Sequence, residues 1–514
     1  MKKLPLNLFI YSPFLIVLII AIYQRLQIPL VPYSIMDGYY TATVKFFQGI
    51  GLHCGNRLPP YPLIIFLIVY FTQSLSAIVY FQVISGVFSS LFLTYLFYQV
   101  TSISKAQLSW IRYVLTLLIF FTFTLSAPKI ELEYFLRPEI VSQFFLILQI
   151  YFFYKIITSK KLNYYFGIFN FLTFFTPYFQ DKFFGISILN IIIAFILIYR
   201  QKEKKVIYLM KYLCVPLAVF IPIYFSFQWF TSTKSNNPAL DRGLWGYSSL
   251  FWLNQNSIIK TMNKDYNDPT FTRYSKDTLR LYLDFYQTIK GYYHDAFIDI
   301  TSLDKINYQL SSIFNFQTYY QQGTNESLNF RKYYLFRSFI NYPIDYLNRY
   351  YKQIKSLYFP YVSNVFLPNE NIHYGIGYRD VEKNFITDTK NLDIAIPFIS
   401  NYYHQIKSIP TSYYVVFPSR ALNKLYFFFN FLYTPILTMF IITFLTEIKS
   451  KSYKDIGLIA LYSALQGFLM LSFTSFIYLN FDRYTAEVYP ALLFSLLTMI
   501  FYLLLKFKYA FFNH

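Results

Sequence analysis

Charged side chains are scarce in this sequence. Lys, Arg, Asp and Glu together account for 14% of the 514 residues, while hydrophobic residues account for 55% and aromatic residues for 23%. An ordinary soluble domain carries about 25% charged residues. The shortage of charge excludes a typical soluble globular protein and predicts one that crosses a membrane several times.

Residues that bind metals or form disulfides are equally few. The two cysteines, Cys54 and Cys214, fall in a loop and in an apolar segment, so the sequence predicts neither a metal site at them nor a disulfide between them. The five histidines are scattered and form no His-x-x-x-His pair. No zinc site, glycine-rich phosphate loop or Ser-His-Asp arrangement is readable from the spacing.

Acidic residues are outnumbered by basic ones, 25 to 45, which gives a formal charge of +20. Such a balance can indicate nucleic-acid binding, but most Lys and Arg residues lie in short loops between apolar runs. That is the positive-inside distribution of a membrane protein, whose inner face meets anionic lipids. The expected partners are therefore membrane lipids and no nucleic acid.

About ten apolar runs are long enough to be spans. The stretch from Pro60 to Phe71 is excluded because about a dozen residues cannot cross a core that needs roughly 20, so it is predicted to lie in the outer interface. With the N-terminus inside, the basic loops near Lys105, Lys160, Lys202 and Lys451 and the C-terminal tail then all face the cytoplasm. The prediction is an all-α polytopic protein of the inner (plasma) membrane, with both termini cytoplasmic. The predicted spans cover about residues 6–22, 77–98, 111–125, 141–157, 164–175, 184–199, 208–227, 425–444, 456–473 and 488–505.

The composition changes between the seventh and eighth spans. Residues 232–419 are rich in Asn, Asp, Lys, Ser and Tyr, and such a length is too great for a loop without structure of its own. Helical spacing is visible from Ser275 to Ile289 and from Tyr333 to Tyr358. We therefore predict an external, mainly helical soluble domain at 232–419, between membrane domains at 1–231 and 420–514.

Because successive spans cross the membrane in opposite directions, the same topology places four polar clusters on the external face. Each lies just outside a predicted span, where it meets both water and lipid, and this is where an enzyme with a lipid-linked substrate needs its chemistry. The clusters contain Asp37 and Arg57; Glu131, Glu133, Arg137 and Glu139; Asp181 and Lys182; and Asp482, Arg483 and Tyr484.

Two of these clusters carry a family resemblance. Asp37, an amphipathic segment and then Arg57-Leu-Pro-Pro-Tyr-Pro-Leu63 resemble the first external loop (25–75) of GT-C membrane glycosyltransferases of the bacterial protein-mannosyltransferase or lipid A aminoarabinose transferase type. Arg483-Tyr484 followed by Pro490 resembles the signature at the start of their last long span. A third match, Ile340-Asn-Tyr-Pro-Ile-Asp-Tyr-Leu347, resembles a helix of bacterial relatives. Members of this family (glycosyltransferase family 39-like) take a sugar from a polyprenyl phosphate.

The resemblance implies roles for the residues of the first loop. Asp37 would be the general base or would orient the acceptor, and a carboxylate that takes the acceptor proton contributes about 10²–10⁴-fold. The residues alone also allow Asp37 to be a helix N-cap. Arg57 would bind the donor phosphate, to which its planar, permanently charged group is suited. Anchoring to lipid headgroups is the alternative for Arg57.

The other clusters would complete the site. Glu133 or Glu131 would be a second acid, preferred over Glu139, because an acid at the start of a span is favoured by the helix dipole alone. Acids near Asp37 could also hold a divalent cation through oxygen ligands, and metal use stays open. The remaining phosphate-binding candidates are Arg137, Lys182 (where relatives carry Arg-Pro), Arg483 and Tyr484, with a salt-bridged turn as the alternative for Arg483.

The predicted function is transfer of a sugar from a polyprenyl-phosphate donor to a glycan, lipid or protein acceptor at the external face, with inversion if Asp37 is a base. One rival is an O-antigen polymerase or ligase, which shares the span number and a large external loop. The other is a transporter or flippase, which predicts charged or Gly/Pro-broken segments inside the spans.

Overall fold

The structure is a computed structural model and is almost entirely helical. The one pair of strands among the residues it describes is antiparallel, β1 (Gly375–Gly377) with β2 (Tyr413–Val415). A predominantly helical fold, as predicted, is therefore confirmed. The structure describes residues 4–32, 43, 60–104, 108–159, 164–180, 182–200, 205–234, 250–251, 254–292, 324–355, 375–377, 401, 404–405, 408, 413–415, 419–446, 453–477 and 482–512.

A helix is present at each predicted span. Six helices of the described residues are long and apolar enough to cross a membrane, or up to seven if α5 and the short helix that follows it, bent by 43°, form one span. A multi-span membrane protein is thus supported by length and composition. The helices are α1 (Leu4–Gln27), α4 (Ser76–Thr101), α5 (Ser109–Thr124), α7 (Glu139–Ser159), α8 (Tyr164–Phe179), α9 (Phe183–Tyr199), α10 with a π turn and α11 (Lys205–Leu209, Met210–Cys214, Val215–Lys234), α20 (Ser419–Thr446), α21 (Lys454–Ile477) and α22 (Asp482–Phe512).

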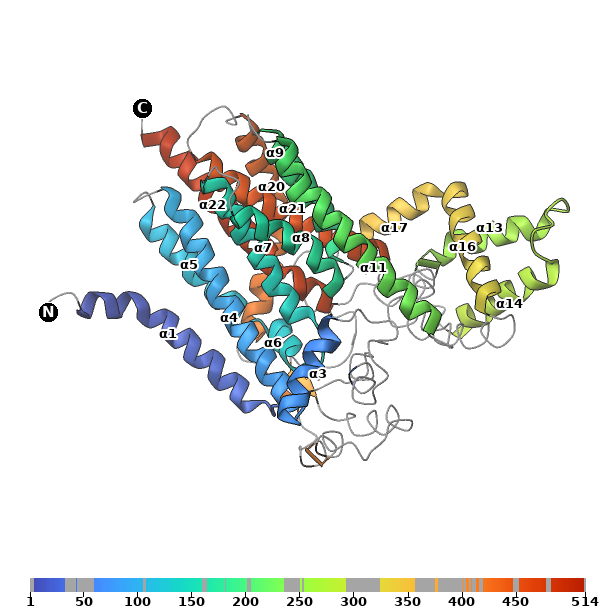
Figure 1. The fold of residues 1–514 in the computed structure, drawn as a ribbon, viewed down its shortest axis with the longest axis horizontal. Coiled ribbons are helices and arrows are strands. Elements are labelled where there is room, and N and C mark those ends of the chain that lie inside the picture. Colours follow the sequence, from blue (N-terminus) through green and yellow to red (C-terminus); the bar gives the residue numbers. More distant parts are fainter. Residues whose placement is uncertain are drawn as a thin grey trace.

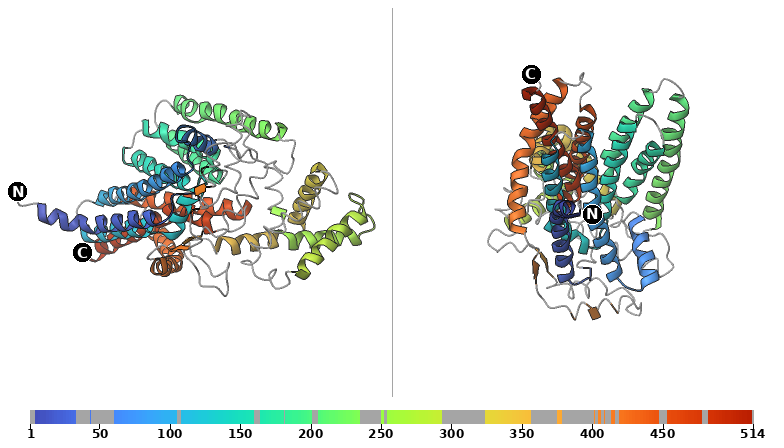
Figure 2. Two further views of the ribbon diagram at one scale, coloured as in Figure 1. Left: turned by 90° about the horizontal axis from the view of Figure 1, so that it is seen from below. Right: turned by 90° about the vertical axis from the view of Figure 1, so that its left-hand side faces the viewer.

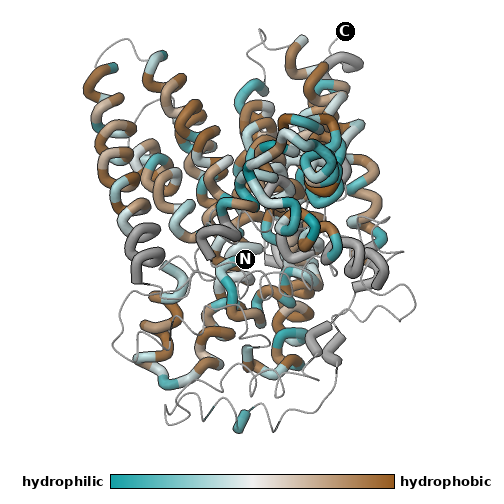
Figure 3. Tube along the Cα trace, turned by 90° about the vertical axis from the view of Figure 1, so that its right-hand side faces the viewer, coloured by the Kyte–Doolittle hydropathy of each residue, from teal (hydrophilic) through white to brown (hydrophobic). Residues whose placement is uncertain are grey.

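The long helices form one bundle around α22. In an 18-residue apolar window of its candidate span, Ala486–Lys508, 89% of the residues are buried, because α22 packs against α5, α7, α20 and α21. A helix that is apolar all round belongs in a core. The right-hand view of Figure 2 shows the long helices side by side and roughly parallel, and Figure 3 shows their predominantly hydrophobic colour.

Neutral polar contacts tie the bundle together internally. The Gln466 amide donates to Gln149 Oε1 at 2.9 Å and to the Tyr462 hydroxyl at 2.7 Å, and that hydroxyl donates to Asn190 Oδ1 at 2.8 Å. These bonds join α7, α9 and α21, as amides commonly do between membrane helices.

Two short helices lie at one end of the bundle, α3 (Pro60–Thr72) and α6 (Ala127–Tyr134), as Figure 1 shows. With 13 residues, α3 confirms the prediction of a short helix after Pro60, and its place in the outer interface stays a prediction. The segment from Lys129 onward, which the sequence marked only as a charged link between spans, is helical as far as Tyr134. Pro128 lies in its first turn, a position that proline favours.

Four further helices lie to one side of the bundle in Figure 1: α13 (Gln255–Asn267), α14 (Lys276–Tyr292), α16 (Thr324–Asn341) and α17 (Pro343–Lys355). They enclose a small core of their own that includes Ile258, Met262 and Phe330. The helix predicted from Tyr333 to Tyr358 is instead two helices, because Pro343 disfavours helical geometry at the residue before it. The predicted domain limits stay predictions: α11 continues to Lys234, and α20 begins at Ser419.

Candidate functional site

The predicted site residues fall into three groups. Asp37 and Arg57 lie outside the described residues. Arg483 and Tyr484 lie in the first turn of α22, where only the backbone is described. Glu131, Glu133, Arg137 and Lys182 are described, and they belong to the two short polar regions where α6, α7 and α9 begin or end, at one end of the bundle.

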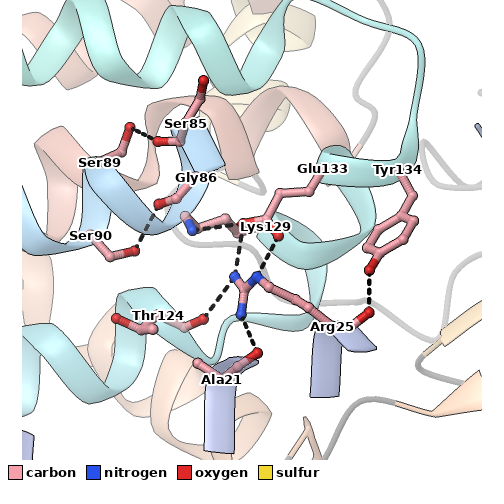
Figure 4. Close-up of polar contacts among 10 residues, drawn as sticks. All are labelled: Ala21, Arg25, Ser85, Gly86, Ser89, Ser90, Thr124, Lys129, Glu133 and Tyr134. Atoms are coloured by element: carbon pink, nitrogen blue, oxygen red, sulfur yellow. Dashed lines mark hydrogen bonds and ion pairs between the residues drawn. The ribbon is translucent and has the colours of Figure 1, made fainter. Parts of the chain in front are cut away.

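The first region is the Glu133 cluster, formed by Arg25, Lys129 and Glu133 (Figure 4). Arg25 Nε donates to Glu133 Oε2 at 2.6 Å, and its Nη2 donates to Oε1 at 2.8 Å. Lys129 Nζ donates to the same Oε1 at 2.9 Å. All three side chains are nearly or fully buried, and the two cations leave the cluster with one net positive charge.

This cluster joins α1 to the bend between α5 and α6. Arg25 also donates to the carbonyl oxygens of Ala21 and Thr124, and the Tyr134 hydroxyl donates to the Arg25 carbonyl at 2.7 Å. On the other side α4 approaches through Gly86, where an added Cβ would lie 2.8 Å from Glu133 Cδ. The absence of a side chain at position 86 is what allows the carboxylate to occupy this place.

The geometry of Glu133 does not favour proton transfer to or from a substrate. Its side chain is fully buried, and both carboxylate oxygens accept hydrogen bonds from cations. Glu131 is partly exposed, since residues two apart on a helix point in different directions. Of the two acids that the sequence left open, Glu131 is therefore the better second acid, and its role stays a prediction.

The second region is the Glu487 cluster, formed by Glu139, Gln180, Lys182 and Glu487. Lys182 Nζ lies 2.7 Å from Glu487 Oε2, with both side chains buried. The Gln180 amide, oriented by its surroundings, donates to the same carboxylate at 2.5 and 3.1 Å. Glu139 is 5% exposed and interacts electrostatically with Glu487, and its Oε2 accepts no hydrogen bond.

Two helices start at this cluster, and a third contributes its second turn. Glu139 opens α7, Lys182 precedes α9, and Glu487 lies in the second turn of α22. Helix N-termini present free N–H groups and a partial positive charge, which together attract anions. Lys182 is not a free cation within this arrangement, because Glu487 already holds it.

Hydrogen bonds fix the chain around the cluster. Gln143 Nε2 donates to the Ala486 carbonyl at 2.7 Å and so joins α7 to α22. Gln82 Nε2 donates to the carbonyl oxygens of Phe135 and Arg137 at 2.7 and 2.9 Å. The partly buried Arg137 guanidinium lies over the Phe135 ring, 4.6 Å from its centre. The link between α6 and α7 is thus held in place, and Arg137 with it.

The structure brings Lys182 to the start of α22. Arg483 precedes Glu487 by four residues, which places the two on the same face of the helix one turn apart. Arg25, Lys129, Glu139 and Glu487 were not predicted as site residues from the sequence. The spacing of Lys129 to Glu133 was a readable signal, since residues four apart can pair on a helix.

Among the described residues no group of three or more His, Cys, Asp or Glu side chains is arranged to hold a metal ion. The divalent cation named as an alternative stays a prediction. Comparisons with protein-family models, with curated proteins and with solved structures found no match.

Proposed function

We propose that the chain is an integral membrane glycosyltransferase of GT-C type. It transfers a sugar from a polyprenyl-phosphate donor to a glycan, lipid or protein acceptor at the external face of the inner membrane. It has about ten spans, both termini in the cytoplasm and the domain of residues 232–419 outside. The observation that carries the proposal is the Lys182–Glu487 pair, which joins the start of α9 to the turn that follows Arg483 and Tyr484.

The two clusters limit where the donor phosphate can bind. Glu139 and Glu487 outnumber Lys182, so a phosphate cannot bind inside this buried cluster without repulsion from carboxylates. The donor phosphate therefore binds outside this cluster, and Arg57, Arg137, Arg483 and Tyr484 remain its proposed ligands, as the resemblance implies. Lys182 acts on it only indirectly, by holding the start of α22 through Glu487.

The acceptor side rests on Asp37. The resemblance makes it the general base, with Glu131 as the second acid in place of the buried Glu133. Transport of the lipid-linked sugar is the weaker alternative. Within the described spans the buried ion pair Lys182–Glu487 lies at helix starts, while the contacts of Gln466 deeper in the bundle are neutral, and a transport path through the bundle would need ionisable groups there.

Transfer from a defined donor tests the proposal. The full chain in membrane vesicles receives undecaprenyl phosphate carrying radiolabelled hexoses or pentoses, together with envelope material as acceptor, and loss of label from the lipid is followed. Asp37→Asn, which keeps size and capping ability, is expected to bind undecaprenyl phosphate normally and to transfer sugar about 10²-fold more slowly. Arg483→Ala is expected to lose binding of undecaprenyl phosphate.

The matched control is Arg280→Gln, because the Arg280 side chain is 70% exposed on α14, outside both clusters. It should bind and transfer like the unmodified chain. Near-normal transfer by Asp37→Asn would remove the proposed base. No transfer from any donor of the panel by the unmodified chain, with undecaprenyl phosphate bound, would favour the transporter instead.

A further inference from the structure

The hairpin of α16 and α17 has an apolar face that is exposed among the residues that the structure describes. Large hydrophobic side chains recur along it at helical spacing and are between 47% and 68% exposed. A soluble surface rarely leaves so many large apolar side chains together. The α16–α17 face consists of Phe336, Phe339, Ile340, Ile344, Leu347 and Tyr351.

The opposite side of the same hairpin is firmly packed. Tyr334 and Ser338 are buried in the small core with α13, and the Tyr346 hydroxyl lies 2.6 Å from Ser338 Oγ. Arg337 binds Asp265 of α13 with two hydrogen bonds of 2.7 and 2.8 Å. The hairpin is therefore held in this orientation by contacts on its inner side, and the exposure of the outer face is a property of the fold.

The hairpin lies next to the membrane-length helices. Of the four helices in this unit α17 is the one that packs against α21, a candidate span. In Figure 1 α17 lies closest to the bundle, and α14 lies farther away. A face joined to a span in this way is near the bilayer surface whenever the spans are in the membrane.

The charge of the hairpin fits a lipid surface. Residues 324–355 contain six basic and two acidic residues, which gives +4. Of the basic side chains, Lys332 is exposed on α16 beside this face, whereas Arg331 is buried and Arg337 is paired with Asp265. Basic segments beside a membrane are attracted to anionic headgroups. An apolar face of Phe, Ile, Leu and Tyr combined with basic residues is the composition of helices that lie in the interface.

We propose that the α16–α17 face docks on the membrane surface, with its apolar side chains at the boundary between headgroups and acyl chains of anionic phospholipid. The docked hairpin then holds the α13–α17 unit against the bilayer at a fixed distance from α21. This inference depends on the membrane location of the spans and not on the proposed sugar transfer.

Fluorescence quenching with the full chain tests the docking. Cys54 and Cys214 are replaced by serine, and a bimane label is attached to Leu347→Cys or Ile340→Cys, with Arg280→Cys of α14 as the matched control. The chain is reconstituted into vesicles of phosphatidylcholine, alone or with phosphatidylglycerol. Quenching by lipids with a nitroxide near the headgroup is compared with quenching by iodide in the water.

At positions 340 and 347 nitroxide lipids are expected to quench the label roughly two-fold or more above the Arg280→Cys control, with iodide quenching reduced, and phosphatidylglycerol should strengthen the difference. Iodide quenching equal to that of the control in both vesicle types would overturn the proposal. Protection from both quenchers would also overturn it, since a protein partner or a second copy would then cover the face. All three labelled positions are exposed, so folding of the variants is not at risk.

Discussion

Gly86→Ala should destabilise the protein even though alanine is the better helix former. In the interior of α4 the exchange alone would stabilise by about 1 kcal/mol. The new Cβ, however, would lie 2.8 Å from Cδ and 3.0 Å from Cγ of Glu133. Those distances are too short for carbon atoms, so either the carboxylate or the helix must move.

Moving the Glu133 carboxylate away from the new Cβ would cost stability. It is held by bonds of 2.6 and 2.8 Å from Arg25 and 2.9 Å from Lys129, and all three groups are buried. Disrupting a buried pair costs about 3–5 kcal/mol. Subtracting the gain in helix propensity leaves a net loss of about 2–4 kcal/mol for Gly86→Ala.

Unfolding of the purified chain in mild detergent, followed by temperature and by SDS titration, measures this loss. Gly167→Ala on α8 is the matched control, because among the described residues its added Cβ would meet Tyr212 alone, at 3.6 Å, an ordinary contact. It should be neutral or slightly stabilising. In a Glu133→Ala background the cost of Gly86→Ala should vanish, since the clashing atoms are gone. Equal stability of the two glycine variants, or a cost that persists without Glu133, would refute the reasoning.

Two further predictions concern the other cluster and the topology. Lys182→Met should lower the free energy of unfolding by about 3–5 kcal/mol, because it leaves the buried Glu487 without its cation. The double variant Lys182→Met/Glu487→Leu should recover most of that loss, because it removes the unpaired charge as well. The same unfolding assay tests both, and a double variant no more stable than the single one would contradict the reasoning. Cysteines placed near Lys160, Lys202 and Lys451 should react with an impermeant thiol reagent only after cells are permeabilised. Cysteines within 232–419 should react in intact cells. The reverse pattern would remove the proposed site from the external face.

The helical framework was predictable because a membrane leaves the backbone few choices. A long apolar run such as residues 488–505 must satisfy its own hydrogen bonds, so it forms a helix wherever it lies. The order of the basic loops then predicts which ends of the helices face the cytoplasm. The break at Tyr342 was readable too, since Pro343 follows it. What the runs do not encode is which helices touch, and so α22 as the central helix could not be predicted.

The pairs within the clusters were beyond the reach of sequence reasoning for a related reason. Lys182 and Glu487 are 305 residues apart, and Arg25 and Glu133 are 108 apart. Because successive spans cross the membrane in alternating directions, the sequence could place Lys182 and the start of the last span on the same face of the membrane. Which of the residues on that face form a pair depends on how the helices pack. Hence the sequence marked Glu133 as an acid for chemistry, whereas the structure surrounds it with two cations.

The two ends of the loop that carries Asp37 and Arg57 are attached to the same framework. Before the loop, Arg25 ties the end of α1 to Glu133 of α6. After it, the Tyr61 hydroxyl at the start of α3 accepts a hydrogen bond of 2.9 Å from Gln82, whose amide also holds the Arg137 carbonyl. Asp37 follows Pro32 by five residues, and a chain of that length reaches at most about 18 Å. The buried Glu133 therefore serves the proposed chemistry best as an anchor: it fixes where the loop starts, close to the helix that leads to Arg137.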